Sequence, residues 1–76
     1  MDEFFLRMTA IMDFLAEAVT SYDRSTIVAS ESFFRGFITA LNMSNNYGLW
    51  TRFCAYYREH GKYKHMADLL FARVDG

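Results

Sequence analysis

Few residues of this 76-residue chain have the types and spacing that catalysis requires. Asp13 and Glu17 stand four residues apart, which places two carboxylates on one face of a helix. We expect that face to point outward, where solvated carboxylates keep the ordinary acidity that general acid–base catalysis cannot use. The sequence contains no nucleophile elbow, glycine-rich phosphate loop or metalloprotease motif. It therefore predicts a protein that is not an enzyme and has no cofactor.

The residues that could bind a metal ion are too scattered to form a site. The candidates are Cys54, His60, His65 and Asp68, and only the last two have a spacing that shares a helix face. No pair has the spacing of zinc ligands, and Cys54 is expected to face the core. A buried cysteine behaves as a small apolar residue, whereas a reactive thiolate needs an accessible, electropositive setting. We predict no metal site and no nucleophile.

Basic residues gather in the C-terminal half, around Tyr56. The possible contacts to phosphates or to an acidic partner are Arg52, Arg58, Lys62 and Lys64. The whole chain has 8 basic and 9 acidic residues, a net charge of -1 that is unlike a basic nucleic-acid module. A helix-turn-helix is also not indicated, because the predicted connection before the third helix is too long. A small nucleic-acid-binding transcriptional regulator is therefore the alternative function, and not the favoured one.

The charges are unevenly distributed along the chain. Residues 1–47 carry three basic and six acidic residues, whereas residues 48–76 carry five basic and three acidic residues. Ordinary solvated faces explain this pattern, and so does head-to-tail or antiparallel self-association. A chain this short stabilises itself more easily when it shares a core with a second copy. We therefore predict a homo-oligomer, most simply a homodimer.

The composition predicts one folded domain, residues 1–76. With 53% hydrophobic and 22% charged residues, the chain is unlike a disordered one, and it is too short for two cores. Its longest apolar runs have three residues, so we expect no membrane partner. Asp2 and Glu3 lie where an export signal would carry positive charge. The single Cys54 cannot form an internal disulfide, so the chain needs no oxidising compartment. These features favour a cytoplasmic location.

The absence of proline and the wide spacing of the four glycines favour long helices. Apolar residues recur every three or four positions, which predicts a compact all-α bundle of three to four helices. The predicted helices span about 2–22, 26–42, 49–60 and 62–74.

Local signals refine these boundaries. The polar stretch from Tyr22 to Thr26 predicts a turn followed by an N-cap, and the second helix is expected to begin near Ser25 or Thr26, although its first turn could fray towards Ser30. Gly36 lies inside that helix and suggests that another helix passes close to its backbone. Gly61 follows the third helix, where a residue with positive φ is often needed.

The C-terminal part carries a pattern of large and small residues, namely Trp50, Phe53, Cys54, Tyr57, Gly61 and Tyr63. This pattern resembles one tetratricopeptide-type helical hairpin, over about 25 residues from Trp50 to Val74. Ala67 and Phe71 match its Ala-x3-Phe element after a shift of one residue. The resemblance implies a protein-binding surface without chemistry. Because one repeat is not stable alone, it also implies that the first two helices act as a degenerate partner hairpin; the alternative is an independent four-helix arrangement.

The 14 aromatic residues exceed what one small core can bury, since a domain of this size hides only about 60% of its extended-chain surface. Large side chains that point away from the main apolar stripes are Leu6, Phe14, Phe33, Tyr56 and Leu69. We expect them to form a contiguous patch for a partner, with Phe14 and Tyr56 as the first contacts. The sequence thus predicts a small non-catalytic protein-binding module. Adaptors, chaperones and the stoichiometric inhibitors or regulators that mobile elements encode all belong to this class.

Overall fold

The computed structural model describes residues 3–75 and shows an all-α bundle, which confirms the predicted fold class. Its four α-helices are α1 (Glu3–Ser21), α2 (Arg24–Met43), α3 (Tyr47–His60) and α4 (Ala67–Asp75). A short 3-10 helix, η1 (Lys64–Met66), precedes α4. Asp2, the predicted first residue of the first helix, lies outside the described residues.

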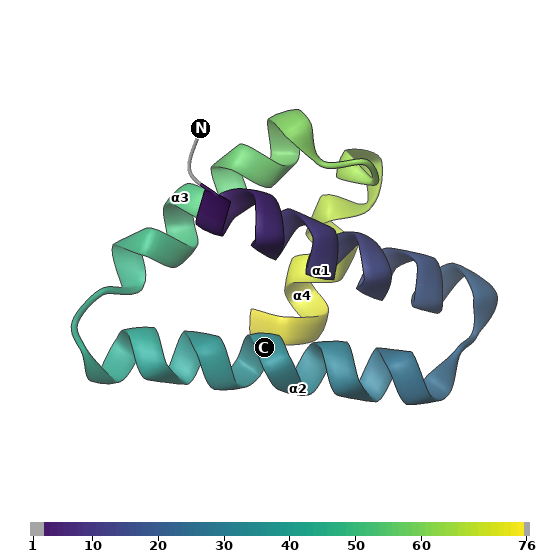
Figure 1. The fold of residues 1–76 in the computed structure, drawn as a ribbon, viewed down its shortest axis with the longest axis horizontal. Helices are drawn as coiled ribbons and strands as arrows, with labels where there is room; N and C mark the ends of the chain where they lie inside the picture. Colours follow the sequence, from purple (N-terminus) through teal and green to yellow (C-terminus); the bar gives the residue numbers. More distant parts are fainter. Residues whose placement is uncertain (1–2, 76) are drawn as a thin grey trace.

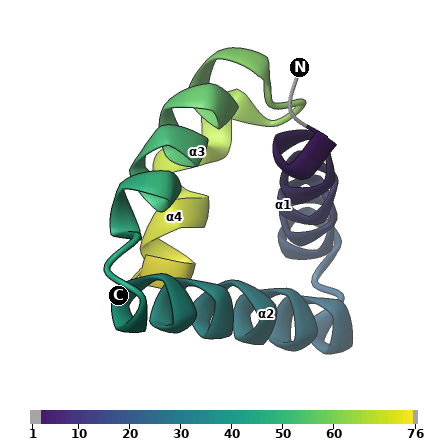
Figure 2. The same cartoon turned by 60° about the vertical axis from the view of Figure 1, so that its left-hand side comes forward.

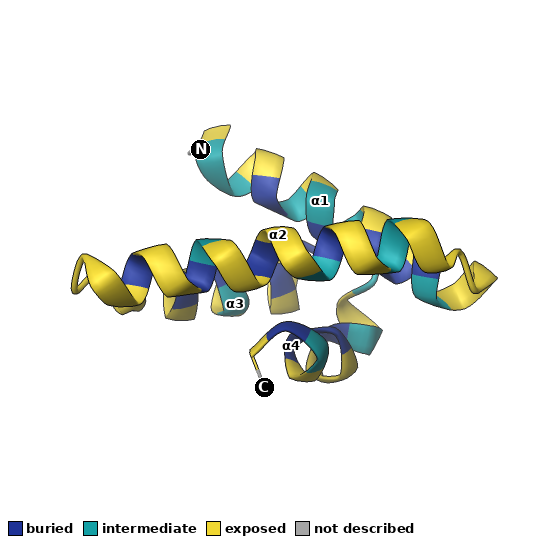
Figure 3. Ribbon diagram, turned by 90° about the horizontal axis from the view of Figure 1, so that it is seen from below, coloured by how far each residue is buried: buried dark blue, intermediate teal, exposed yellow. Residues whose placement is uncertain are grey.

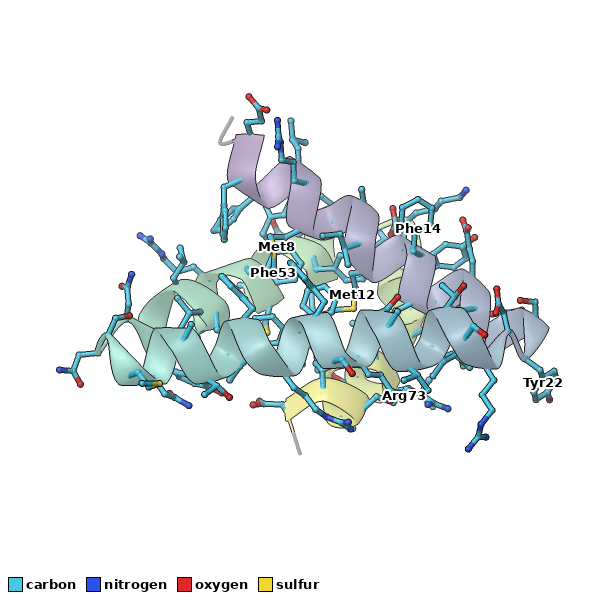
Figure 4. The ribbon with its side chains drawn as sticks, turned by 60° about the horizontal axis from the view of Figure 1, so that its bottom comes forward. Met8, Met12, Phe14, Tyr22, Phe53 and Arg73 are labelled. Atoms are coloured by element: carbon cyan, nitrogen blue, oxygen red, sulfur yellow. The ribbon has the colours of Figure 1, made fainter. Side chains whose placement is uncertain are left out.

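α1 and α2 form an antiparallel hairpin, against which α3 and α4 pack (Figure 1). In Figure 2, α2 runs along the bottom of the bundle. α1 lies above it at the right, and α3 and α4 lie above it at the left. Met8 and Met12 of α1 point towards Phe53 of α3 across the interior (Figure 4). All four helices contribute buried side chains to a single core.

Trp50 lies at the centre of that core and is almost fully buried. Its ring is 5.8 Å from that of Phe34 in α2, 5.6 Å from Phe53 in α3 and 6.0 Å from Phe71 in α4, measured between centroids. These tilted and edge-on arrangements are the ones that aromatic quadrupoles favour. These aromatic residues therefore join α2, α3 and α4.

The N-cap of α2 is Asp23, within the predicted polar stretch, so the helix begins at Arg24, one or two residues earlier than predicted. The Asp23 carboxylate accepts hydrogen bonds from the backbone N–H of Thr26 (3.2 Å) and from its hydroxyl (2.8 Å). These bonds hold the pKa of Asp23 below its ordinary value. The helix does not fray towards Ser30, which is buried on its inner face.

The predicted fourth helix, 62–74, is wrong in its first five residues. Gly61 is in an extended conformation (φ −68°, ψ 143°), and η1 intervenes before α4 begins at Ala67. The backbone N–H of Tyr63 donates to the Tyr57 hydroxyl (3.3 Å) instead of to a helical carbonyl. A side chain of α3 thus satisfies a backbone donor that would have had no intrahelical acceptor in the first turn of the predicted helix.

Both predictions about the glycines are also wrong, the positive φ of Gly61 and the close approach of a helix to Gly36. Gly61 has a negative φ, but a Cβ added there would lie 2.5 Å from the Tyr57 ring, so close packing requires this glycine. Gly36 is exposed, and a Cβ added there would meet nothing within 4 Å. The left-handed conformation occurs instead at Tyr22 (φ 59°) and Asn45 (φ 58°), in the turns on either side of α2.

Among the described helices, none combines the length and the hydropathy needed to span a membrane.

Candidate functional site

The solvent-facing side of α2 has almost no charge. Of its 12 exposed residues only Arg24 and Arg35 are charged, whereas 8 of the 20 exposed residues in α1, α3 and α4 are. A surface helix normally carries its charged residues opposite the core. We call the uncharged exposed residues of α2 the α2 outer face; they are Ser25, Val28, Ala29, Ser32, Phe33, Gly36, Thr39, Ala40, Asn42 and Met43.

The α2 outer face combines large exposed side chains with small ones. Val28 is 54% exposed, Phe33 45% and Met43 83%. Between them lie alanine, serine and the bare backbone of Gly36. Seen from below, α2 lies in front of α1 and α3, and exposed residues recur along its whole length (Figure 3). A second helix could therefore approach its axis closely between the large side chains.

Two of the three charged residues of α2, Glu31 and Arg35, interact with α4. Arg73 of α4 donates to the Glu31 carboxylate (2.8 Å), and the Arg35 guanidinium donates to the backbone carbonyl oxygen of Arg73 (2.6 Å). Arg35 also lies 4.0 Å from Glu31. This network fixes α4 against α2, although Arg35 remains exposed and Arg24 takes no part in the network.

A groove of about 430 Å³ adjoins the N-terminal end of the α2 outer face. It is lined by Tyr22, Arg24, Ile27, Val28, Glu31 and Arg73. Tyr22 is 89% exposed and points away from the body of the molecule, whereas Arg73 lies on α4 beside α2 (Figure 4). The left-handed conformation of Tyr22 costs an L-residue roughly 1–2 kcal/mol. The fold gains no packing from this ring in return.

The structure distributes the five predicted contact residues over all four helices. Leu6 and Phe14 are exposed on α1, Phe33 on α2 and Leu69 on α4. Tyr56 of α3 is only partly exposed, because its ring packs on Phe5 (5.3 Å) and His60 (4.6 Å). Of the five, only Phe33 belongs to the α2 outer face.

Phe14 lies beside a shallow hollow between α1 and the start of α2. The hollow is also lined by Glu17, Ala18, Ser21, Asp23 and Thr26. The polar atoms of Asp23 and Thr26 are engaged in the cap of α2, and Ser21 donates to a carbonyl of its own helix. The hollow therefore offers a partner few free polar groups.

The sequence predicted that Asp13 and Glu17 lie on a solvated face without partners. In the structure each of them accepts a hydrogen bond from a tyrosine. The Tyr57 hydroxyl donates to Asp13 (2.7 Å), and the Tyr63 hydroxyl donates to Glu17 (2.9 Å), which Lys62 also approaches (3.4 Å). Burial, followed by the bond to Asp13, raises the pKa of Tyr57, and the bond to Glu17 raises that of Tyr63. The two carboxylates hold the α3–α4 connection on α1.

The basic cluster is largely neutralised within the fold. Arg58 forms an ion pair with Asp68 (2.6 Å) and lies over the Phe71 ring, and Lys62 pairs with Glu17. Lys64 donates to the backbone carbonyl oxygen of Glu59 (3.5 Å). Within the described chain only Arg52 of the four has neither an ion pair nor a hydrogen bond. The cluster therefore presents less free positive charge than the sequence suggests.

Cys54 lies in a second groove of about 340 Å³, between α3 and α4. Trp50 and Phe71 form its apolar wall, and the Tyr47 hydroxyl donates to Asp75 at its edge (3.0 Å). Burial raises the pKa of the Cys54 thiol to about 11, against a smaller opposing effect of Arg58. The thiol is thus protonated at neutral pH. In residues 3–75 no group of three or more histidine, cysteine or acidic side chains could hold a metal ion.

Sequence reasoning missed Tyr22, Val28 and Met43. A usable signal was present, since the 20 residues of α2 include only three charges, Arg24, Glu31 and Arg35. A solvent-exposed helix with so few charges must expose uncharged surface.

Comparison with known proteins adds no relative. No protein-family model matches the chain, and neither a curated protein nor a solved structure matches it. The resemblance of residues 50–74 to a tetratricopeptide-type hairpin stays a prediction.

Proposed function

We propose that this chain is a small, non-catalytic protein-binding module whose α2 outer face packs against an apolar helix of a partner protein. The observation that carries the proposal is the lack of charge on that face, together with the exposure of Val28, Phe33 and Met43. Exposed apolar patches on small soluble domains commonly mark interaction sites.

Three large side chains would lose solvent exposure on binding. Burying a fully exposed side chain of this size contributes roughly 1.5–3 kcal/mol. Val28 and Phe33, which are already about half buried, would each add about half of that. These contributions offset part of the cost of association. The small residues between them let two helix axes approach to about 8–10 Å, the usual packing distance. Val28 and Phe33 are five residues apart, about 140° around the helix axis, so they would contact a partner from the two flanks of the face, with Met43 at its C-terminal end, and binding would be stoichiometric.

α2 is also held firmly enough in the fold to present such a face. The inner side of α2 is anchored by Phe34, Ile38 and Leu41, and its first turn is capped by Asp23. A partner would therefore meet a surface whose backbone is already ordered, which lowers the entropy lost on binding.

The test is a selection of helical peptides from a displayed library against the intact chain. Enriched peptides should bind the wild type, and Phe33→Ser or Met43→Ser should weaken them at least tenfold. Matched controls are Leu6→Ser and Leu69→Ser, which change side chains of similar exposure (51% each) on α1 and α4. The proposal fails if no peptide is enriched, or if the controls weaken binding as much as the α2 variants do.

A further inference from the structure

The groove is lined by Tyr22, Arg24, Ile27, Val28, Glu31 and Arg73. We call its apolar part, Ile27 and Val28, the floor, and its basic part, Arg24 and Arg73, the rim. Its single carboxylate, Glu31, is only 14% exposed and is held by Arg73 at 2.8 Å, with Arg35 at 4.0 Å. The negative charge of Glu31 is thereby compensated, so the rim keeps a net positive charge.

Arg24 has no role in the fold that the described contacts reveal. It forms no ion pair or hydrogen bond within residues 3–75, and its side chain is exposed. It also lies in the first turn of α2, where a positive charge opposes the helix dipole. A cation in this position does not favour the helix, but it is free to meet an anion.

Tyr22 stands beside it in a similar situation. Its ring is 89% exposed, and its backbone occupies the left-handed region that glycine or asparagine would adopt more readily. Tyrosine and arginine are the residue types that most often carry binding energy at protein interfaces. Here both flank a groove that shares Val28 with the α2 outer face.

From this arrangement we infer that the groove receives an acidic side chain of the partner helix, with a neighbouring aliphatic side chain on the Ile27–Val28 floor. The inference rests on the proposed function, and it adds the chemistry and the orientation of the partner. The charge complementarity is specific: an aspartate or glutamate would lie between Arg24 and Arg73, beside Tyr22. Because the groove adjoins only the N-terminal end of the α2 outer face, the acidic residue would fix the direction of the partner helix along α2.

The volume agrees with such an occupant. About 430 Å³ lies within the range of pockets that hold small ligands, and it is enough for one or two side chains. The arginines would also accelerate the encounter with an acidic partner, an effect that salt weakens.

The experiment repeats the peptide selection with the intact wild-type chain and with Arg24→Glu, and measures the affinity of the most enriched peptide at low and high salt. Peptides selected on the wild type should contain aspartate or glutamate next to an aliphatic residue. Arg24→Glu should weaken such a peptide at least tenfold, and replacing the acidic residue of the peptide by its amide should cause a similar loss. Arg52→Glu is the matched control, because Arg52 is also exposed and unpaired in the described chain, and it should change the affinity less than twofold.

A second variant tests the tyrosine. Tyr22→Gly relieves the backbone conformation, so it should raise the melting temperature while weakening the acidic peptide several-fold. A variant that binds as tightly as the wild type would remove Tyr22 from the site and contradict the inference.

The outcomes separate this inference from the proposed function. If enriched peptides depend on Phe33 but lack acidic residues, or bind Arg24→Glu as tightly as the wild type, the groove inference is overturned and the α2 outer face remains. If no peptide is enriched, both are overturned. If light scattering shows that Arg24→Glu converts a dimer to a monomer, the groove is occupied by a second copy, and the inference of a separate acidic partner is wrong.

Discussion

At the scale of single residues, Tyr57 joins three parts of the fold. It is fully buried, its hydroxyl donates to Asp13 of α1, and the same oxygen accepts the N–H of Tyr63. The Tyr57 hydroxyl therefore connects α3, α1 and the segment that leads to α4.

Tyr57→Phe should destabilise the chain by about 1.5–3 kcal/mol, because it removes a hydrogen bond to a charged group and leaves the Tyr63 N–H without its acceptor. Urea unfolding followed by circular dichroism measures the change. A loss below about 0.5 kcal/mol, the lower limit for a typical hydrogen bond, would mean that water replaces the hydroxyl at no cost.

The same residue predicts a dependence on alkaline pH. Burial and the bond to Asp13 raise the pKa of Tyr57 above its ordinary value of 10.0. The unfolded chain thus releases this proton before the folded chain does, so stability is complete below about pH 10 and decreases as the pH rises further. Unfolding free energies between pH 8 and 11 should fall more steeply for the wild type than for Tyr57→Phe. Parallel curves would contradict the assignment.

At the scale of the helices, two glycines of opposite character offer a matched pair of substitutions. Gly61→Ala would place a Cβ 2.5 Å from the buried Tyr57 ring and should destabilise by about 1–3 kcal/mol, as overpacking does. Gly36→Ala, in the middle of α2 with open space around it, should stabilise by about 1 kcal/mol. Thermal unfolding of both variants measures the two effects, and changes of equal sign would contradict the packing described here.

The sequence could predict those parts of the helices that depend on local pattern. The spacing of Phe34, Ile38 and Leu41 follows the helical period, and all three are buried as predicted. The break at residues 61–66 could not be predicted, because it depends on the Tyr57 ring and hydroxyl meeting Gly61 and Tyr63 after folding. The tertiary contact overrides the local helical preference of that segment.

The candidate surface was predictable in kind but not in place. Leu6, Phe14, Phe33 and Leu69 are exposed as expected, yet exposure alone does not gather them on one surface. The position of the α2 outer face depends on which residues of each helix the packing leaves exposed. The helical period places Tyr22 on the apolar stripe of the first helix, which is wrong, because α1 ends at Ser21 and the left-handed turn that follows exposes the ring. A tyrosine in such a turn has no sequence signature, unlike glycine or asparagine.

At the scale of the whole molecule, the predicted homo-oligomer is tested by the mass in solution. Light scattering over a concentration series should give a multiple of the 8.9 kDa chain mass, because a 76-residue domain leaves much apolar surface uncovered. A mass of 8.9 kDa at every concentration would contradict self-association. It would also show that the single core of α1 to α4 suffices to fold the chain.

The central claim is that the α2 outer face binds another protein. Its most direct test is a nuclear magnetic resonance titration of the isotope-labelled chain with a peptide selected from the displayed library. We expect the largest amide shift changes along the solvent side of residues 24–43, with Val28, Phe33 and Met43 among them, and small changes in α3. Shift changes centred on α3 and α4, with α2 unaffected, would contradict the account.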